Sequence, residues 1–577
     1  MVTDQANSAT IAYFSMEVGL EPSVPTYSGG LGVLAGDMLR AAADASAPMV
    51  GVTLLHRKGY FRQYLDRNGR QSESAVEWNP ADRMDPQDVR AFVPVQGRQV
   101  EIRAWCYKVR GVTGYSLPVY FLDTDLPENE EQDRRLTDHL YGGDALYRLK
   151  QEVVLGMGGV AMLRALGHYS LQVYHMNEGH SALLALSLLE EQAGERRLTG
   201  VVPEDVDAVR RRCVFTTHTP VPAGHDRFPM DMVRDVIGEE HADALTSQGC
   251  VPDDTLNMTH LGLFFSRYVN GVSMRHEEVS RDMFPNHPIN SITNGMHAAT
   301  WASDSFREVF DRHISSWRVD NRYLRHAARI PLEEVQQAHR LSKQALFDHI
   351  EQKTGTRLDP GIMTIGFARR AATYKRADLL FTDRERLNRI AETTGSMQFV
   401  FAGKAHPRDE MGKDVIRRIF EASTALSDSI KIVYLQDYDM TLGRLLTSGV
   451  DLWLNTPQRP QEASGTSGMK AALNGVPSLS ILDGWWVEGW VEGVTGWAIG
   501  DNWNGEEDPQ QESALLYDKL EYVVLPMFYS RPGAYAEVMR RAIELNGSYF
   551  TAQRMLSQYL QNAYRAPHLT AIAGGGI

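Results

Sequence analysis

A short loop of glycine, serine and threonine stands directly before a lysine late in the chain. Residues 462–470 read Glu-Ala-Ser-Gly-Thr-Ser-Gly-Met-Lys, and the run 471–474 after them indicates the start of a helix. Such a loop offers free backbone N–H groups and the positive end of a helix dipole to a phosphate. Lys470 then fits two chemistries: a point charge beside the phosphate, or an amine that holds pyridoxal phosphate as an imine. The spacing is not that of a P-loop, and a capped helix with a surface lysine remains an equal alternative.

A cluster of cations follows a predicted strand over residues 362–367. Arg369, Arg370, Lys375 and Arg376 place four positive charges within eight residues of a chain whose net charge is −14. Arginine binds phosphate through a planar fork of donors, and lysine adds a compact charge. The cluster therefore indicates a pocket for phosphate, with a solvated basic turn that opens a helix over 377–390 as the alternative.

Polar residues also follow two predicted strands of the first half. Glu178 and His180 come just after the strand 173–176, and His218 comes just after the strand 214–217. A polar side chain past a buried strand is well placed for a site, although a lone histidine is often only a hydrogen-bonded structural residue. The HExxH and HxxEH spacings do not occur, so we predict no metal site.

Two glycine turns complete the set of candidate positions. Gly30 lies in the run Tyr-Ser-Gly-Gly-Leu-Gly over 27–32, which precedes a helical pattern over 34–45. Its backbone N–H could meet an anion at a helix N-terminus, or the run could simply be a tight turn. Asn294, in the turn 294–297, could bind a hydroxyl group.

The elements that must position these residues alternate along the chain. Short apolar runs at 173–176, 214–217, 362–367, 399–402, 430–434 and 452–454 read as buried strands, with helical stretches such as 146–166 and 414–422 between them. This pattern predicts an α/β protein with parallel sheets covered on both faces. A polar, helical stretch near 315–354 interrupts the pattern. We therefore expect two doubly wound, Rossmann-like domains over residues 1–315 and 361–528, a helical linker over 316–360, and C-terminal helices over 529–577 that fold back on the first domain.

Composition narrows the class of protein. Hydrophobic residues make up 43% and charged residues 23% of 577 positions, which is ordinary for a globular protein. The acidic balance argues against a nucleic-acid surface. Three cysteines without CxxC spacing suit a reducing compartment, and residues 1–5 lack the start of a signal peptide. No apolar run is long enough to span a membrane, so we expect a cytoplasmic protein.

Two anion sites, several hydroxyl-binding candidates and a cleft between two domains together indicate a phosphorylated, polyhydroxylated ligand. At this point the sequence resembles the α-glucan phosphorylases, the glycogen and maltodextrin phosphorylase family, in a short bacterial-type form. The matching segments follow the order of the family over most of the chain, at 12–17, 28–32, 177–180, 217–220, 293–295, 369–376 and 462–474.

The resemblance implies a GT-B fold with the active site in the cleft between the two Rossmann-like domains. It implies that the first domain serves the sugar and the second serves pyridoxal 5′-phosphate, held as an imine on Lys470. In this family the phosphate of the cofactor does the chemical work, exchanging a proton with the substrate phosphate. By residue-wise carry-over, the cofactor phosphate meets Arg369 and the amides of Gly465, Thr466 and Ser467.

The same carry-over assigns the substrate contacts. Arg370, Lys375 and the Gly30 amide would bind inorganic phosphate or glucose 1-phosphate. The sugar and acceptor contacts would come from His218, Asn294, Glu462, Ser464, Glu178, His180 and Tyr374, and the residues expected to act in catalysis are Lys470, Arg370, Lys375 and His218. The implied reaction is reversible, retaining phosphorolysis of a terminal α-1,4-linked glucose, with α-glucan or maltooligosaccharide and inorganic phosphate as partners. Relatives commonly form homodimers.

Two features depart from the family pattern. Arg369 stands where the better-known members carry lysine, which keeps the charge but changes its shape. The chain is also much shorter than those enzymes, so control by nucleotide or phosphorylation is not expected. A nucleotide-sugar-dependent GT-B glucosyltransferase, such as a glucan synthase, and a catalytically inactive glucan-binding protein are the alternative functions.

Overall fold

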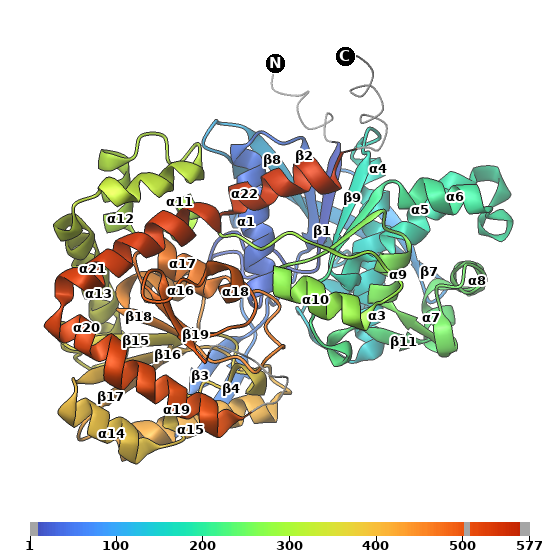
Figure 1. Ribbon diagram of the computed structural model, residues 1–577. Coiled ribbons are helices and arrows are strands. Elements are labelled where there is room, and N and C mark those ends of the chain that lie inside the picture. Colours follow the sequence, from blue (N-terminus) through green and yellow to red (C-terminus); the bar gives the residue numbers. More distant parts are fainter. Residues whose placement is uncertain (1–9, 501–507, 566–577) are drawn as a thin grey trace, which may run out of the picture.

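The computed structural model describes residues 10–500 and 508–565, and the segment 1–5 discussed above lies outside them. Two large sheets, each flanked by helices, make up most of these residues (Figure 1). Their strands alternate with helices along the chain, which confirms the predicted α/β class. Within the described ranges, no helix is both long and apolar enough to cross a membrane.

The N-terminal sheet has the strand order β14-β13-β10-β9-β1-β2-β8-β7-β5, with β6 paired to β7. From β14 to β8 all neighbours are parallel. The strands are β1 (Ile11–Ser15), β2 (Met49–Leu54), β5 (Asp85–Pro86), β6 (Ala91–Val95), β7 (Arg98–Arg110), β8 (Ser116–Asp123), β9 (Val173–Asn177), β10 (Cys213–Thr216), β13 (Tyr268–Gly271) and β14 (Asn290–Ser291).

Alternate residues of β1 enter two separate cores because successive side chains point to opposite faces of the sheet. Phe14 packs in one core with helix α5 (Leu184–Ala193), and Tyr13 packs in the other with helix α1 (Gly30–Asp44). The predicted covering of both faces is therefore confirmed for the centre of this sheet.

The edge of this sheet differs from the prediction of purely parallel pairing. β7 runs antiparallel to β8 and also to β5 and β6. Only residues 111–115 join β7 to β8. So short a connection fits a hairpin, whereas parallel neighbours need a crossover of a dozen or more residues.

The C-terminal sheet is parallel throughout, with the order β17-β16-β15-β18-β19-β20. Its strands are β15 (Met363–Ala368), β16 (Met397–Ala402), β17 (Lys431–Leu435), β18 (Leu452–Asn455), β19 (Ser478–Ile481) and β20 (Gly496–Ile499). They include all four strands predicted for this half. The order reverses between β15 and β18, so a crevice opens beyond the carboxyl ends of these two strands. The loops that carry the basic cluster and the Gly/Ser/Thr run start near this point.

The helical boundaries near the basic cluster differ from the prediction of one helix over 377–390. A short 3-10 turn covers Leu379–Phe381, and helix α14 begins only at Arg384 and ends at Thr393. Arg376 has a left-handed backbone with φ of 48°, which interrupts any helix there. The Asp383 side chain then accepts a hydrogen bond from the Arg386 N–H and caps the start of α14.

Two segments join the two sheets. The hairpin of β3 (Arg62–Leu65) and β4 (Gln71–Ser74) reaches the C-terminal half, where the Gln63 side chain donates to the Gly403 carbonyl at 2.9 Å. After the helices that flank the C-terminal sheet, helix α22 (Ala552–Gln558) returns and lies beside α1 (Figure 1).

Candidate active site

Lys470 lies inside a helix rather than before one. Helix α17 spans Ser467–Leu473, so the helix starts four residues earlier than predicted and Lys470 lies at its middle. Gly465, just before it, has φ of 78°, a conformation that favours glycine. A side chain on Gly468 would clash with the Trp485 ring at 2.7 Å. These small residues therefore allow the loop to turn tightly into a buried helix.

The Lys470 side chain is 7% exposed, and its Nζ atom lies 3.7 Å from the centre of the Trp301 ring. Burial lowers the pKa of Lys470 to about 8, although the carboxylate of Asp37 acts in the opposite direction. An amine with this pKa is partly neutral near physiological pH. Lys470 is thus a buried potential nucleophile and not a solvated surface lysine.

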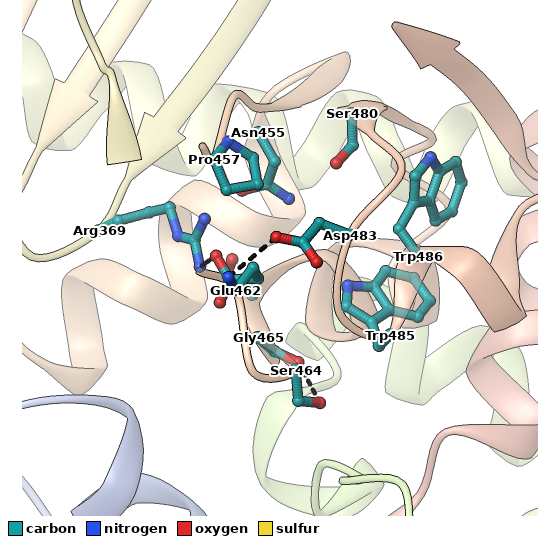
Figure 2. A pocket seen from close by; sticks show the side chains of 11 residues that line it. Arg369, Asn455, Pro457, Glu462, Ser464, Gly465, Ser480, Asp483, Trp485 and Trp486 are labelled. Carbon is teal, nitrogen blue, oxygen red and sulfur yellow. Dashed lines mark hydrogen bonds and ion pairs between the residues drawn. The ribbon is translucent and has the colours of Figure 1, made fainter. Parts of the chain in front are cut away.

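Two cations of the basic cluster converge on one carboxylate. Arg369 Nη2 lies 2.5 Å and Lys375 Nζ lies 2.6 Å from the same Glu462 oxygen. Burial alone would raise the pKa of Glu462, but these two charges hold it at about 2. Figure 2 shows the Arg369 guanidinium pointing at Glu462 across the pocket. The sequence predicted that Arg369 and Lys375 belong to one basic cluster, but it did not predict their contact with Glu462.

The other residues of the cluster separate. Arg376 pairs with Glu512 of helix α19 (Pro509–Lys519) at 2.6 Å and donates to the Pro457 carbonyl, so it has a structural contact away from the pair above. The Arg370 side chain is exposed, and its charge acts on Tyr60 and His406. The Lys375 ammonium group also lies 4.4 Å from the centre of the Tyr374 ring.

A carboxylate that was not predicted, that of Asp483, binds the backbone at the start of the Gly/Ser/Thr loop. Asp483 accepts hydrogen bonds from the backbone N–H groups of Glu462 at 2.9 Å and Gly484 at 3.0 Å. It is 2% exposed, and burial raises its pKa to about 7. Figure 2 shows it between Glu462 and the Trp485 and Trp486 rings. Its position just past β19 is the signal that could have identified it.

Gly30 is the first residue of α1, and a side chain built on it would meet no atom within 4 Å. The preceding N–H groups of Ser28 and Gly29 donate to a Glu17 oxygen at 2.5 and 3.3 Å. An internal carboxylate therefore already uses two donors of this turn, while the backbone at Gly30 borders open space.

Glu178, His180 and His218 lie where the sequence placed them, beyond β9 and β10. Glu178 accepts from the His218 backbone N–H at 2.7 Å, and it has φ of 76° and ψ of 167°, a region that few residues other than glycine occupy. The His218 ring nitrogen Nε2 donates to the Asn177 side-chain oxygen at 2.6 Å. Burial lowers the pKa of His218 to about 3, so its imidazole is neutral at physiological pH. His180 lies 3.1 Å from Arg148 Nη2.

Asn294 is 5% exposed, and its side-chain oxygen is buried without a hydrogen-bond partner among the residues that the structure describes. Its backbone is fixed by Arg554 of α22, which donates to the Thr293 carbonyl at 2.6 Å and to the Asn294 carbonyl at 2.8 Å. No local sequence pattern marks Arg554, so its contact with Asn294 was not predicted. A buried acceptor without a donor suits a ligand hydroxyl group.

The two halves meet at the Gly/Ser/Thr loop. Ser273 of the N-terminal half donates to the Ala463 carbonyl at 2.6 Å, while the Ser464 hydroxyl donates to the Gly465 carbonyl through a long bond of 3.3 Å. Trp301, which contacts Lys470, is hydrogen-bonded to Asp37 of α1. These contacts hold the Gly/Ser/Thr loop and the helix that carries Lys470 against the N-terminal half.

Comparisons with known proteins show the family of the chain. A family model described as carbohydrate phosphorylase matches residues 239–493. The maltodextrin phosphorylase of Thermococcus litoralis is 38% identical over 97% of this chain and 71% of its own length. The glycogen phosphorylases of Mycobacterium tuberculosis and Aquifex aeolicus are 38% and 34% identical, over 98% and 96% of this chain and 71% and 86% of their own lengths. With this degree of similarity along nearly the whole sequence, the chain belongs to the carbohydrate phosphorylase family, whose GT-B fold its two α/β sheets match.

Proposed function

We propose that the protein is an α-1,4-glucan phosphorylase, which transfers a terminal glucose from an α-glucan or maltooligosaccharide to inorganic phosphate. The product is glucose 1-phosphate, the α configuration is retained, and the reaction is reversible. The observation that carries this proposal is a buried lysine of lowered pKa, placed one helical turn after the Gly/Ser/Thr loop at residues 465–467, where a side chain on Gly465 would lie 3.5 Å from Arg369. A glucan synthase that uses a nucleotide sugar would not require such an amine.

The residues present fit pyridoxal 5′-phosphate. The buried amine of Lys470 suits a covalent anchor, and the face of Trp301 beside it offers a flat apolar wall. Arg369 and the backbone amides of Gly465, Thr466 and Ser467 would hold the phosphate of the cofactor. When bound, the cofactor supplies a phosphate that can donate a proton to the substrate phosphate or accept one.

Arg370, Lys375 and the Gly30 amide are assigned to inorganic phosphate. The exposed Arg370 guanidinium and the open space at Gly30 suit a ligand that enters and leaves. Because Lys375 already pairs with Glu462, an incoming phosphate competes with that carboxylate for the ammonium group. Glu462 is then free to accept hydrogen bonds from sugar hydroxyl groups, and Ser464 beside it donates to them.

The remaining residues bind and orient the sugar. His218 is neutral, so it acts as a hydrogen-bond partner, and the unpaired oxygen of Asn294 accepts a hydrogen bond from a sugar hydroxyl group. Glu178, His180 and Tyr374 line the acceptor side. Fixed positive charge at Arg369, Arg370 and Lys375 stabilises the phosphates as positive charge develops at the anomeric carbon. We assign the sugar contacts to a domain of residues 1–315 and the phosphates to a domain of residues 361–528, linked through 316–360. Of the C-terminal helices, α21 (Pro532–Arg541) packs on the C-terminal half, and α22 returns to the first domain.

The test is glucose 1-phosphate release from maltodextrin by the purified protein with added phosphate. Release that requires both substrates supports the proposal. Glucose transfer from a nucleotide sugar without phosphate would favour the synthase alternative, and glucan binding without release would favour the inactive binding protein.

A further inference from the structure

Asp37, Trp301 and Lys470 form a row across three helices. Asp37 lies on α1, Trp301 ends helix α11 (Ala298–Trp301), and Lys470 lies on α17. The indole N–H of Trp301 donates to the Asp37 carboxylate at 2.8 Å, and the Lys470 ammonium nitrogen lies 3.7 Å from the centre of the same ring. One edge of the indole therefore meets the acid, and its face meets the amine.

The row is buried along its whole length. Asp37 is 1%, Trp301 2% and Lys470 7% exposed. A buried carboxylate is costly without a partner, and the indole N–H supplies one to both of its oxygens, at 2.8 and 3.1 Å. A carboxylate that accepts from the indole N–H makes the ring more electron-rich. Its face then attracts a cation more strongly.

The indole has little freedom to move. Asn474 donates to the Trp301 carbonyl at 3.0 Å and to the Lys470 carbonyl at 2.8 Å, which ties α11 to α17. A side chain on Gly443 would lie 3.6 Å from the six-membered ring of Trp301, so helix α16 (Met440–Gly449) closes that side. A change in the Asp37 contact is thus transmitted to a ring whose position is already defined.

The other charged groups on the neighbouring elements face different partners. Arg444 of α16 lies 3.7 Å from Asp304. Glu544 pairs with Arg541 at 2.6 Å. His297, which precedes α11, contacts Asp44 at 2.8 Å. Asp37 is the charged group that acts on Lys470.

We propose that Asp37 is a positioning residue for Lys470: through the Trp301 indole it holds the lysine amine at the place where the cofactor must attach. The inference rests on the proposed function for the identity of that cofactor, but the hold on the amine is a property of the protein alone. Neither Asp37 nor Trp301 belongs to the candidate residues that the sequence motifs indicate.

The first test needs no cofactor. The full-length protein, freed of cofactor, is labelled with trace acetic anhydride at a series of pH values, and the rate at Lys470 is followed by peptide mass spectrometry. The wild-type midpoint is expected near pH 8. Asp37→Asn keeps an acceptor for the indole N–H but loses the charge, and it is expected to lower the midpoint by about 0.5 pH units or more. A Trp301→Phe background, which lacks the N–H, is expected to reduce this shift by at least about half.

The second test measures the dissociation constant of pyridoxal 5′-phosphate for the same proteins. Asp37→Asn is expected to weaken binding roughly threefold to thirtyfold. The matched control is Asp44→Asn, on the same helix but paired with His297, which is expected to change neither readout. An unchanged Lys470 midpoint in Asp37→Asn overturns the inference even if the cofactor binds. Wild-type protein that binds no cofactor overturns the proposed function instead, and the labelling midpoint then still decides whether Asp37 acts on Lys470.

Discussion

The ammonium group of Lys375 lies 2.6 Å from the carboxylate of Glu462, within a pocket where both side chains are almost fully buried. The same carboxylate oxygen contacts Arg369. An internal anion thus neutralises the two charges that we propose to bind phosphate, and phosphate binding is expected to depend on Glu462.

Replacing Glu462 separates phosphate binding from turnover. In Glu462→Gln the internal negative charge is lost, so inorganic phosphate is expected to bind roughly threefold to tenfold more tightly. The same change replaces a charged acceptor by a neutral one in the proposed sugar contact, and kcat is expected to fall by about 100-fold or more. Calorimetric titration with phosphate and steady-state kinetics measure the two effects. Weaker phosphate binding in this variant would contradict competition between Glu462 and phosphate.

Removing the Lys470 amine is expected to abolish both cofactor retention and activity. Lys470→Ala leaves no nucleophile in the buried position, so the purified variant should lack the absorbance of bound pyridoxal phosphate. Lys404→Ala is a suitable control, because Lys404 pairs with Asp437 near the β3–β4 hairpin. Full activity of Lys470→Ala would refute the anchor assignment.

Replacement of Arg554 is expected to weaken the binding of glucan more than the binding of phosphate. Arg554→Met removes the donors that fix the carbonyls of Thr293 and Asn294, so the unpaired Asn294 oxygen loses its defined position. The KM for glucan should rise by about tenfold, with a smaller change in the KM for phosphate. Equal changes in both constants would instead indicate a general loss of structure.

The folded protein is expected to lose free energy of unfolding on mild acidification, because several of its histidines are buried. Burial lowers the pKa of His175 to about 3 and those of His56 and His276 to about 4. The unfolded chain takes up protons on these rings below an ordinary pKa of about 6.5, whereas the folded chain does not. Their contribution is complete above that pH and is lost as the pH falls toward 4, by up to about 1.4 kcal/mol per unit and per histidine.

Thermal melting at pH 7 and pH 5 tests this prediction. The wild-type Tm should be lower at pH 5, and His175→Asn should show a smaller drop between the two values because one titrating ring has been removed. A Tm difference that is identical in the variant would contradict the assigned role of His175.

The strands of the C-terminal sheet could be predicted because parallel strands buried on both faces are continuous apolar runs, as in residues 399–402. The antiparallel edge could not. β7 alternates between buried and partly buried residues over much of its length, and its pairing depends on a turn five residues long. The early start of α17 was not predicted, because Ser467 and Gly468 are poor helix formers. Glycine is present at position 468 because the Trp485 ring packs against its backbone and leaves no room for a side chain.

The candidate site could be predicted wherever a residue follows a strand or belongs to a local motif, as with Lys470 and His218. Contacts between distant segments left no such signal. Trp301 and Asp37 stand 264 positions apart, and Arg554 reaches Asn294 across 260 positions. The pairing of Glu462 with Arg369 was hidden for a different reason: sequence shows which charges lie near the loop, but not which of them neutralise each other.

The role proposed for the Lys470 amine as the anchor of pyridoxal 5′-phosphate can be tested by chemical trapping. The purified protein is reduced with borohydride, digested with a protease and examined by mass spectrometry. The peptide containing Lys470 is expected to carry a phosphopyridoxyl group on that lysine, in roughly equimolar amount with the protein. An unmodified Lys470 peptide, or a phosphopyridoxyl group on another lysine, would contradict it.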